Sequence, residues 1–308
     1  MSNLLEIKDR VIVLMGSTSG LGRALATGLA GEGAIVIPSG RREVQLLGQI
    51  VNHYSAPDDA NCDFAQLLAE VDAIPGIERI RFASPHPRHT GARLIEAVRE
   101  LRHVCKHFHL PVQSGSTQIL HAMRRRHTRE EYLDLVAKIR EAIPGVTLST
   151  DVIVGFPGET REDFEDTLSL TDAAQFHSMF SFKYSPRPNT LASKRLPDDV
   201  SAEEKTARIV ALQELQRSIQ TRLHEQAIGT DVDVLVDSAS RRKNQELSGR
   251  TSGNTVVSLP MPSDTSHSDA ATDWIGRTIT VHITRSGPHN LSGEAVSWVA
   301  PRMETRSC

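Results

Sequence analysis

Residues 43 to 190 repeat one local pattern, in which a short apolar strand ends in a polar turn and an amphipathic helix follows. Strands that alternate with helices pair in parallel, and their polar carboxyl ends gather at one rim of the sheet or barrel. The pattern therefore predicts an α/β fold, a full or partial barrel, with its binding site at that rim. The predicted strands are 43–47, 79–82, 147–154 and 178–182, and the predicted helices are 64–73, 94–102, 132–142 and 163–174.

The stretch from His107 to Tyr132 shows the pattern most clearly, with the sequence HFHLPVQSGSTQILHAMRRRHTREEY. A short apolar run leads to the polar turn QSGS, and a helix pattern begins only after that turn. Strand, polar turn and helix are typical of a ligand site at the end of a parallel strand. Arg124, Arg125 and Arg126 follow and suit a polyanion such as RNA, although a solvated helix surface is an equal alternative.

The first 43 residues open with an apolar strand over 11–15, a glycine-bearing turn, a helix over 23–30 and a second strand over 34–37. Glycines in such a turn allow a phosphate to approach the helix N-terminus closely. These residues resemble the start of the short-chain dehydrogenases, which implies a Rossmann-like βαβ nucleotide-binding fragment. The resemblance assigns nucleotide contacts to Gly16, Gly20, Gly22 and Arg41, the last at the position of the 2′-phosphate charge in NADP-preferring members.

The dehydrogenase resemblance ends at residue 43. None of Tyr54, Tyr132 and Tyr184 has a lysine four residues later, so the Y-x-x-x-K pair of that family is missing. An NADP-binding oxidoreductase is therefore only an alternative, and NADP is not expected as a cofactor. The next strand also starts too soon after 34–37 for a parallel crossover. We predict a hairpin or a bent continuation there, with a change of lineage near 41–43.

The chain contains three cysteines, Cys62, Cys105 and Cys308, and no C-x-x-C or C-x-x-x-C-x-x-C grouping. Zinc sites and iron–sulfur clusters need thiolates that are brought together, usually by such short spacings. We therefore predict no metal ligands in this chain.

Six segments, in chain order, resemble the tRNA methylthiotransferases, radical S-adenosylmethionine (SAM) enzymes that install a 2-methylthio group on N6-isopentenyladenosine 37. The segments are LLGQIVNHY, IRFASPHP, HFHLPVQSGS, MRRRHTREEY, STDVIVGFPGET and FSFKYSPRPNTLA. The resemblance implies a partial radical SAM (β/α) barrel over residues 44–200, with SAM and [4Fe-4S] clusters as family cofactors. The side chains that it places around the SAM pocket are Gln49, Asn52, Ser84, His86, Gln113, Ser114, Asp151 and Gly155.

Amides, hydroxyls and a carboxylate from several strand ends suit a zwitterionic ligand that bears a ribose. Each of these residues has an alternative role in a turn or a helix cap. Glu159 illustrates this alternative, because GET opens the predicted helix over 163–174 and a carboxylate there complements the helix dipole.

The chain departs from the methylthiotransferases at the cluster cysteines. In that family a C-x-x-x-C-x-x-C motif precedes the strand that is 44–47 here, and a separate cluster-bearing domain precedes the motif. The dehydrogenase-like piece stands in their place. We therefore expect no cluster binding and no radical chemistry by this chain alone, and assign no catalytic residue. The leading hypothesis is a truncated, fused relative of the methylthiotransferases that is inactive alone.

The C-terminal third begins with a capping box at Ser201–Glu204 and a predicted connecting helix over 201–228. Short strands of period two over 229–300, four or five of them, predict a small β-barrel, and 301–308 form a tail. This region resembles the TRAM module that closes the methylthiotransferases and binds tRNA. The expected phosphate contacts are Arg241, Arg242, Lys243 and Arg250. A non-catalytic tRNA-binding protein is therefore the second hypothesis.

Charge and hydropathy restrict the remaining possibilities. The formal net charge of −3 creates no global field for nucleic acid, so RNA must be bound by local patches. No apolar run approaches the roughly 18 residues of a membrane helix, and the N-terminus has no signal-peptide pattern. We predict a cytoplasmic monomer whose partner is tRNA, with no membrane or DNA partner.

Overall fold

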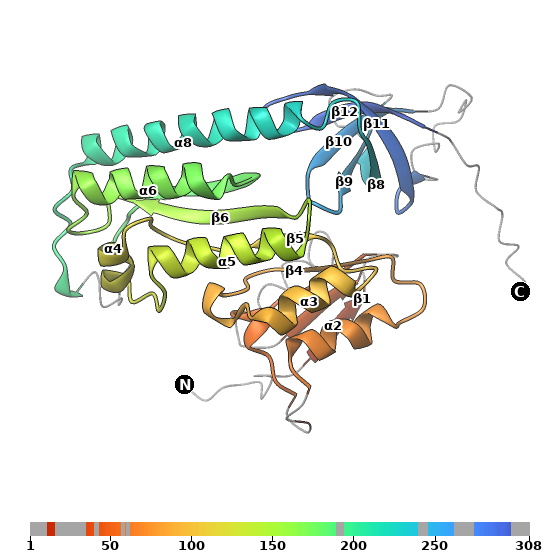
Figure 1. Cartoon of the computed structure of the whole chain (residues 1–308), viewed down its shortest axis with the longest axis horizontal. Coiled ribbons are helices and arrows are strands. Elements are labelled where there is room, and N and C mark those ends of the chain that lie inside the picture. Colours follow the sequence, from red (N-terminus) through yellow and green to blue (C-terminus); the bar gives the residue numbers. More distant parts are fainter. Residues whose placement is uncertain are drawn as a thin grey trace, which may run out of the picture. The chain divides into compact units, whose positions relative to one another are not determined.

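The computed structural model describes residues 11–15, 35–39, 43–56, 59, 62–188, 194–239, 246–261 and 274–296. The chain divides into two compact units, residues 1–219 and 220–308 (Figure 1). The helix predicted over 23–30 lies outside the described residues. The predicted site residues that also lie outside them are Gly16, Gly20, Gly22, Arg41, Arg241, Arg242 and Lys243.

A four-stranded sheet contains β1 (Val11–Met15), β2 (Ile35–Ser39), β3 (Glu43–Leu46) and β4 (Arg79–Phe82), in that order. β1 pairs with β2 in parallel, and β3 pairs with β4 in parallel. β2 and β3 instead run antiparallel and pair at Ser39 and Val44. The predicted tight reversal after the second strand is therefore confirmed, and no crossover helix separates β2 from β3.

Three further parallel strands follow β4 along the chain. They are β5 (His107–His109), β6 (Thr147–Val154) and β7 (Ser178–Lys183). Val104, just ahead of β5, bridges Ile80 of β4 in parallel. The backbone amide of Ile80 donates to His103 at 2.7 Å, and that of Cys105 donates to Ile80 at 2.9 Å. β3 to β7 thus form one parallel series, the predicted partial barrel.

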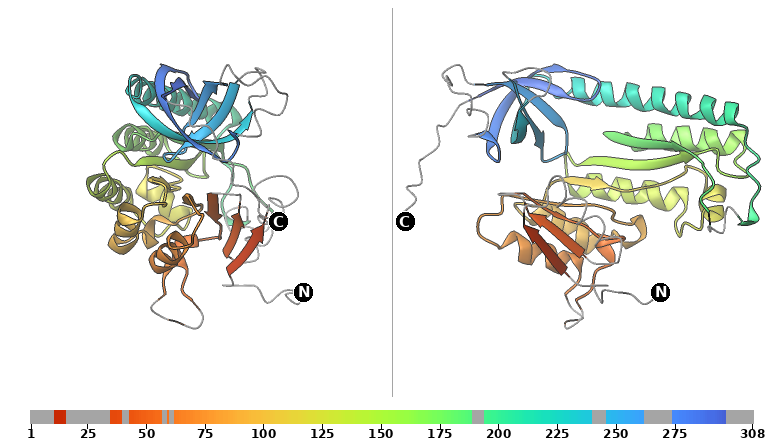
Figure 2. Two further views of the ribbon diagram at one scale, coloured as in Figure 1. Left: turned by 90° about the vertical axis from the view of Figure 1, so that its right-hand side faces the viewer. Right: turned by 180° about the vertical axis from the view of Figure 1, so that it is seen from behind.

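Helices lie on one side of this series (Figure 2). They are α2 (Phe64–Asp72), α3 (Ala92–Glu100), the short α4 (Thr117–Ala122), α5 (Arg129–Ala142) and α6 (Arg161–Ala174). Their apolar faces bury the core against the strands, with Phe108 and Tyr132 among the largest fully buried side chains. The Tyr132 hydroxyl donates to the Leu110 carbonyl at 2.8 Å, so its one polar atom is satisfied. Burial of side chains of this size contributes about 1.5–3 kcal/mol each.

The start of α6 corrects the interpretation of Glu159. Thr160 is the N-cap and forms a capping box with Asp163, so Glu159 does not serve the helix dipole at the surface. Glu159 is 4% exposed, and its Oε2 lies 2.7 Å from Nη1 of Arg208 on α8 (Ala202–Glu225). The dipole interpretation is wrong because the charge partner lies 49 residues away, beyond the reach of any local pattern.

The second unit is the predicted small β-barrel, with five strands in the closed order β10-β12-β11-β8-β9. Their bounds are β8 (Asp231–Ala239), β9 (Glu246–Thr251), β10 (Val256–Pro260), β11 (Thr278–Ser286) and β12 (Leu291–Ala295). Alternate residues point into its core, which contains Val234, Leu247 and Trp274. Gly249 is required there, because a Cβ would stand 2.3 Å from the Leu235 carbonyl oxygen.

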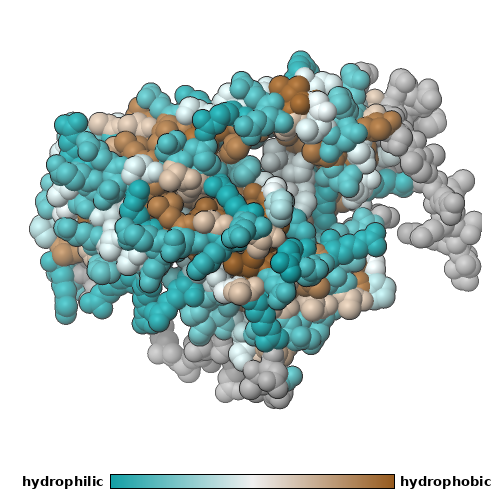
Figure 3. Space-filling view, viewed as in Figure 1, coloured by the Kyte–Doolittle hydropathy of each residue, from teal (hydrophilic) through white to brown (hydrophobic). Residues whose placement is uncertain are grey.

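The face shown in Figure 3 is largely hydrophilic, and hydrophobic residues form small groups within it. Such scattered groups are ordinary on a protein surface and need no partner. Among the described residues, none of the helices is both long and apolar enough to span a membrane.

Candidate functional site

Three successive strands of the partial barrel end in a left-handed backbone conformation. Ser84 follows β4 with φ 60°, Gln113 follows β5 with φ 76°, and Gly155 follows β6 with φ 70°. This conformation is free for glycine but costs about 1–2 kcal/mol at other residues. Strained backbone of this kind collects at ligand sites, where the surrounding structure holds it in place. The rim predicted from the sequence is therefore the candidate site.

Asn52 ties two of the rim loops together. Its Oδ1 accepts from the His86 amide at 2.8 Å, and its Nδ2 donates to the His86 carbonyl at 3.0 Å and to Thr90 Oγ1 at 3.1 Å. The side chain is buried, and its carboxamide is occupied by these three bonds. Asn52 therefore positions His86, rather than presenting a free group to a ligand. Gln49, just before it, is exposed.

The QSGS turn packs against α6. The Ser114 side chain is fully buried and accepts from the Ser116 amide at 3.2 Å, while Ser116 caps α4. Gly115 approaches α6 so closely that a Cβ would stand 2.4 Å from Thr167 Cα, in direct conflict with backbone. Ser114 thus serves the turn itself. Gln113 is fixed by its backbone, which bonds to Asp151 and Ile153 of β6 at 2.9 Å each, and its carboxamide has no partner among the described residues.

A chain of polar side chains crosses from β5 to β6. Ser149 Oγ lies 3.2 Å from His107 Nε2 and 2.9 Å from His109 Nδ1, and His109 Nε2 lies 3.4 Å from Asp151 Oδ1. Burial, with Arg81 nearby, lowers the pKa of His107 to about 3, so this ring is neutral at neutral pH. Phe180 of β7 pairs with Asp151 in the sheet and is 58% exposed. Asp151 thus offers a carboxylate beside an open aromatic ring.

The end of β6 is held from α8. The amide of Gly155 donates to Glu159 Oε2 at 2.5 Å, and the same carboxylate pairs with Arg208. Burial raises the pKa of Glu159, and the contact with Arg208 offsets part of this rise. A Cβ at Gly155 would stand 2.3 Å from Cγ of Lys205, so glycine is needed for the close approach as well as for the backbone.

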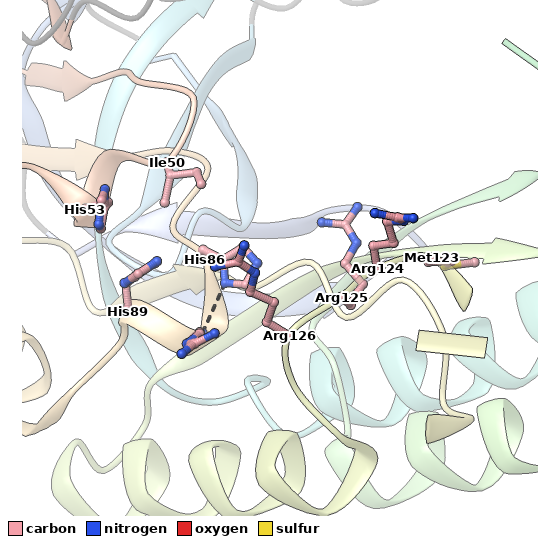
Figure 4. A pocket seen from close by; sticks show the side chains of 9 residues that line it. Ile50, His53, His86, His89, Met123, Arg124, Arg125 and Arg126 are labelled. Carbon is pink, nitrogen blue, oxygen red and sulfur yellow. Dashed lines mark hydrogen bonds between the residues drawn. The ribbon is translucent and has the colours of Figure 1, made fainter. Parts of the chain in front are cut away.

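A pocket of about 410 Å³ opens beside the ends of β3 and β4 (Figure 4). Loops after β3 and β4 form one wall, and the segment after α4 forms the other. The residues that line it are Ile50, His53, His86, Arg88, His89, Met123, Arg124, Arg125 and Arg126. Burial and the neighbouring cations lower the pKa of His86 to about 4 and also lower that of His89. Of the predicted SAM contacts only His86 lines this pocket.

The residues predicted from the sequence did not include His53, Arg88 and His89. The SPHPRH segment, with two histidines and an arginine at a strand end, carried a signal for Arg88 and His89, and the LLGQIVNHY segment contains His53. The structure places His53 against His89, with ring centroids 4.4 Å apart, across 36 residues of sequence.

Cys62 and Cys105 are both buried and form no disulfide, and Cys62 lies ahead of α2 whereas Cys105 lies ahead of β5. Burial raises the pKa of the Cys62 thiol, which disfavours the thiolate that metals bind. Across the described ranges no group of three or more His, Cys, Asp or Glu residues could hold a metal ion. Cys62 and Cys105 are therefore not grouped with other such donors in the described part of the chain.

In the second unit, Arg250 of β9 is exposed but already engaged. Its Nε lies 3.8 Å from Asp237 Oδ2, and its Nη1 donates to Asn254 Oδ1 at 3.3 Å. Gly229–Ala300 contains eight acidic and six basic residues, which limits the electrostatic attraction that this unit alone can exert on RNA.

Comparison with known proteins finds relatives for most of the chain. Residues 41–171 match the radical SAM superfamily, and residues 225–296 match the TRAM domain. The tRNA-2-methylthio-N(6)-dimethylallyladenosine synthase of Solibacter usitatus is 45% identical over 260 residues, which are 84% of this chain and 57% of that protein. The synthase of Chlorobium chlorochromatii is 49% identical over 219 residues, 71% of this chain and 49% of that protein. The chain thus spans about half the length of the curated relatives it matches.

Among solved structures, coproporphyrinogen III oxidase from Escherichia coli, a radical SAM enzyme, is similar over 68% of this chain and 60% of its own. The TM-score is 0.37 and the identity 11%.

Proposed function

Because this chain belongs to the radical SAM proteins and carries a TRAM domain, we propose that it binds tRNA and SAM but cannot assemble the reducing cluster from its own residues. Two relatives are tRNA-2-methylthio-N(6)-dimethylallyladenosine synthases. The ancestral reaction under this proposal is the 2-methylthiolation of N6-isopentenyladenosine 37. By this proposal the chain is a fused, shortened relative that is inactive alone. Any turnover would need cluster cysteines supplied from outside this chain.

The distribution of thiols carries this proposal. A [4Fe-4S] cluster requires cysteine thiolates that converge on one point. The chain has three cysteines, of which Cys62 and Cys105 are buried in separate loops and the third is the last residue. No radical step is assigned to any residue of this chain for that reason.

The rim residues support SAM binding. Asp151, the free carboxamide of Gln113 and the exposed hydroxyl of Ser84 are the groups that would hold the ammonium and ribose hydroxyls of SAM. When bound with a cluster, SAM supplies a radical in this superfamily. The chain's own contribution is binding and orientation. Gly155, Asn52 and Ser114 act by shaping the rim.

Anaerobic reconstitution with iron and sulfide tests the cluster statement. We expect the iron content and visible absorption of the full chain to equal those of the triple variant Cys62→Ser, Cys105→Ser, Cys308→Ser. A stable four-iron signal that the triple variant lacks would overturn the proposal.

Calorimetric titration with SAM tests the binding statement. We expect Asp151→Asn to weaken SAM binding about tenfold or more, because an ionised hydrogen-bond acceptor is lost. Asp134→Asn, at an exposed position of α5, is the matched control and should bind as the wild type does. Equal affinity in both variants would remove Asp151 from the site.

A mobility-shift assay with tRNA at low salt tests the RNA statement. We expect retardation of the tRNA that weakens steeply as salt is raised, as for phosphate contacts in general. No shift at low salt would exclude tRNA as the partner.

A further inference from the structure

The loop 155–160 joins β6 to α6 and directly follows the strand that carries Asp151, the residue proposed above for SAM. Gly155 and Gly158 in this loop adopt a left-handed backbone, with φ 70° and 79°. Glycine has wide conformational freedom, so the position of such a loop depends on contacts from outside it. The residues that supply these contacts therefore affect any ligand that binds where β6 ends.

The first contact is a buried ion pair with the start of α8, which lies beside α6 (Figure 1). Arg208 donates from Nη1 to Glu159 Oε2 at 2.7 Å and to the Glu159 carbonyl at 3.0 Å. The same Oε2 accepts from the Gly155 amide at 2.5 Å. One carboxylate oxygen thus joins the guanidinium group of α8 to the first residue of the loop.

This ion pair is not arranged for maximum stability. Glu159 Oε1 is buried and has no hydrogen-bond partner among the described residues. A half-satisfied buried carboxylate costs free energy, and a buried ion pair is often no more stabilising than apolar side chains of similar volume. The arrangement instead fixes the position of the Gly155 amide, as the residues that support a binding site do.

Two further contacts reach the loop from the same region. The Gly158 amide donates to Asp199 Oδ1 at 2.8 Å, in the turn that precedes α8. Lys205 packs against Gly155, and its Nζ lies 2.5 Å from Asp198 Oδ1. Both glycines of the loop are therefore held by the start of α8 and the turn before it.

A second carboxylate connects the neighbouring loop of the rim to the same helix. Asp163, in the first turn of α6, accepts from Ser116 Oγ at 2.5 Å, and Ser116 belongs to the QSGS turn after β5. Arg208 also attracts Asp163 electrostatically. The guanidinium group of Arg208 thus supports the carboxylates behind two successive loops of the rim.

We propose that the start of α8 supports the SAM site, with Arg208 and Asp199 as positioning residues that hold the loop 155–160 in the conformation that binds SAM. The proposal rests on the proposed binding of SAM. It adds two residues that lie outside the radical SAM match, which covers residues 41–171. Neither side chain contacts the ligand in this proposal, because each acts through the amide or the side chain of a loop residue.

Calorimetric titration of the full chain with SAM tests the two positioning residues. We expect Arg208→Gln to weaken SAM binding about tenfold, the effect of losing one hydrogen bond to a charged group. Asp199→Ala removes the acceptor of the exposed Gly158 amide, and we expect about a threefold loss. Arg208→Lys keeps the charge beside Glu159 and should recover most of the affinity. Arg217→Gln, at an exposed position of the same helix, is the matched control.

Selective ¹⁵N labelling of glycine distinguishes positioning from a general loss of stability. The Gly155 amide donates to a carboxylate, so its proton should resonate far downfield, and Glu159→Gln identifies this signal by moving it upfield. We expect Arg208→Gln to move the same signal in the folded protein. Circular dichroism confirms that each variant is folded.

The outcomes separate this proposal from the proposed function. Wild-type SAM affinity in both Arg208→Gln and Asp199→Ala overturns the positioning role and leaves SAM binding intact. No SAM binding by the wild type overturns both. Weaker binding by Arg208→Gln without movement of the Gly155 signal also overturns the proposal, because the effect then does not pass through the loop. If Arg208→Gln does not fold, Asp199→Ala decides, since affinity equal to that of the exposed control Asp172→Ala overturns the proposal and weaker affinity supports it.

Discussion

The rim of the first unit has two parts with opposite electrostatic character. Beside β3 and β4 the lining of the pocket is cationic and contains no carboxylate. Beside β5 and β6 the charged group is Asp151, in contact with His109. A cationic ligand such as SAM is attracted to the second part and repelled by the first, whereas phosphate has the reverse preference. The difference teaches that neighbouring parts of one rim can favour ligands of opposite charge.

The largest effect is expected at the buried Arg208–Glu159 pair, which holds the end of β6, the strand that carries Asp151. Arg208→Leu leaves the Glu159 carboxylate buried without its partner, which we expect to lower the free energy of unfolding by about 3–5 kcal/mol in urea at neutral pH. RNA binding by the folded fraction should not change. Arg161→Leu breaks an exposed pair whose arginine is 83% exposed, and should cost about 0.5 kcal/mol or less. Equal losses in the two variants would show that the buried pair does not hold the end of β6.

Asn52→Leu affects the part of the rim beside β3 and β4. The amide of His86 loses its acceptor in a part-buried loop, which we expect to cost about 1–3 kcal/mol of stability in thermal or urea unfolding. RNA binding should weaken, since the loop that carries His86 and Arg88 loses its hydrogen bonds to Asn52. Gln66→Leu at an exposed position of α2 is the control. A loss of SAM affinity with intact RNA affinity would reverse the division of the rim.

The pH dependence of stability tests the neutral histidine of β5. The pKa of His107 is about 3 in the folded protein and near 6.5 when the chain is unfolded. The unfolded chain therefore binds the extra proton, so this contribution to stability is complete above about pH 6.5 and is lost as pH falls toward 3. One proton gives a slope of at most about 1.4 kcal/mol per pH unit. His107→Gln should flatten the slope, and His121→Gln, at an exposed position, should not. An identical slope in His107→Gln and the wild type would mean that His107 is charged in the folded state.

The smallest effect is expected at the TRAM domain. Arg250→Gln removes a guanidinium that already contacts Asp237 and Asn254, so we expect RNA affinity to fall about twofold. The mobility-shift assay with tRNA measures it. A loss larger than that of Asn52→Leu would make the TRAM domain the main RNA contact.

The positions of the strand ends could be predicted from sequence, because each apolar run is short and stops at polar residues. The parallel strands 79–82 and 147–154 agree with β4 and β6, and a fifth barrel strand, β9, settles the count of four or five. The family motifs also identified the radical SAM and TRAM regions. What the predicted SAM residues contact is a separate question, and their role remains a prediction.

The partners of individual side chains could not be predicted. Asn52 reads as a free amide in sequence, yet its bonds go to residues 34 and 38 positions later. Glu159 reads as a helix-start carboxylate, yet its partner lies on α8. The pocket escaped prediction for the same reason, since it exists only when the loops after β3 and β4 face the turn after α4. Local patterns specify elements, whereas long-range contacts decide which side chains remain available.

The reversed strand at the start of the sheet has a geometric consequence. Because β2 runs against β3, Met15 at the carboxyl end of β1 lies level with Ser39, and Ser39 pairs with Val44 at the beginning of β3. The carboxyl ends of β1 and β3 therefore lie at opposite ends of the strands of one sheet. A ligand bound at the carboxyl end of β1 would be separated from the rim of β3 to β7 by the length of the strands. A ligand at the end of β1 would therefore leave the rim of β3 to β7 accessible.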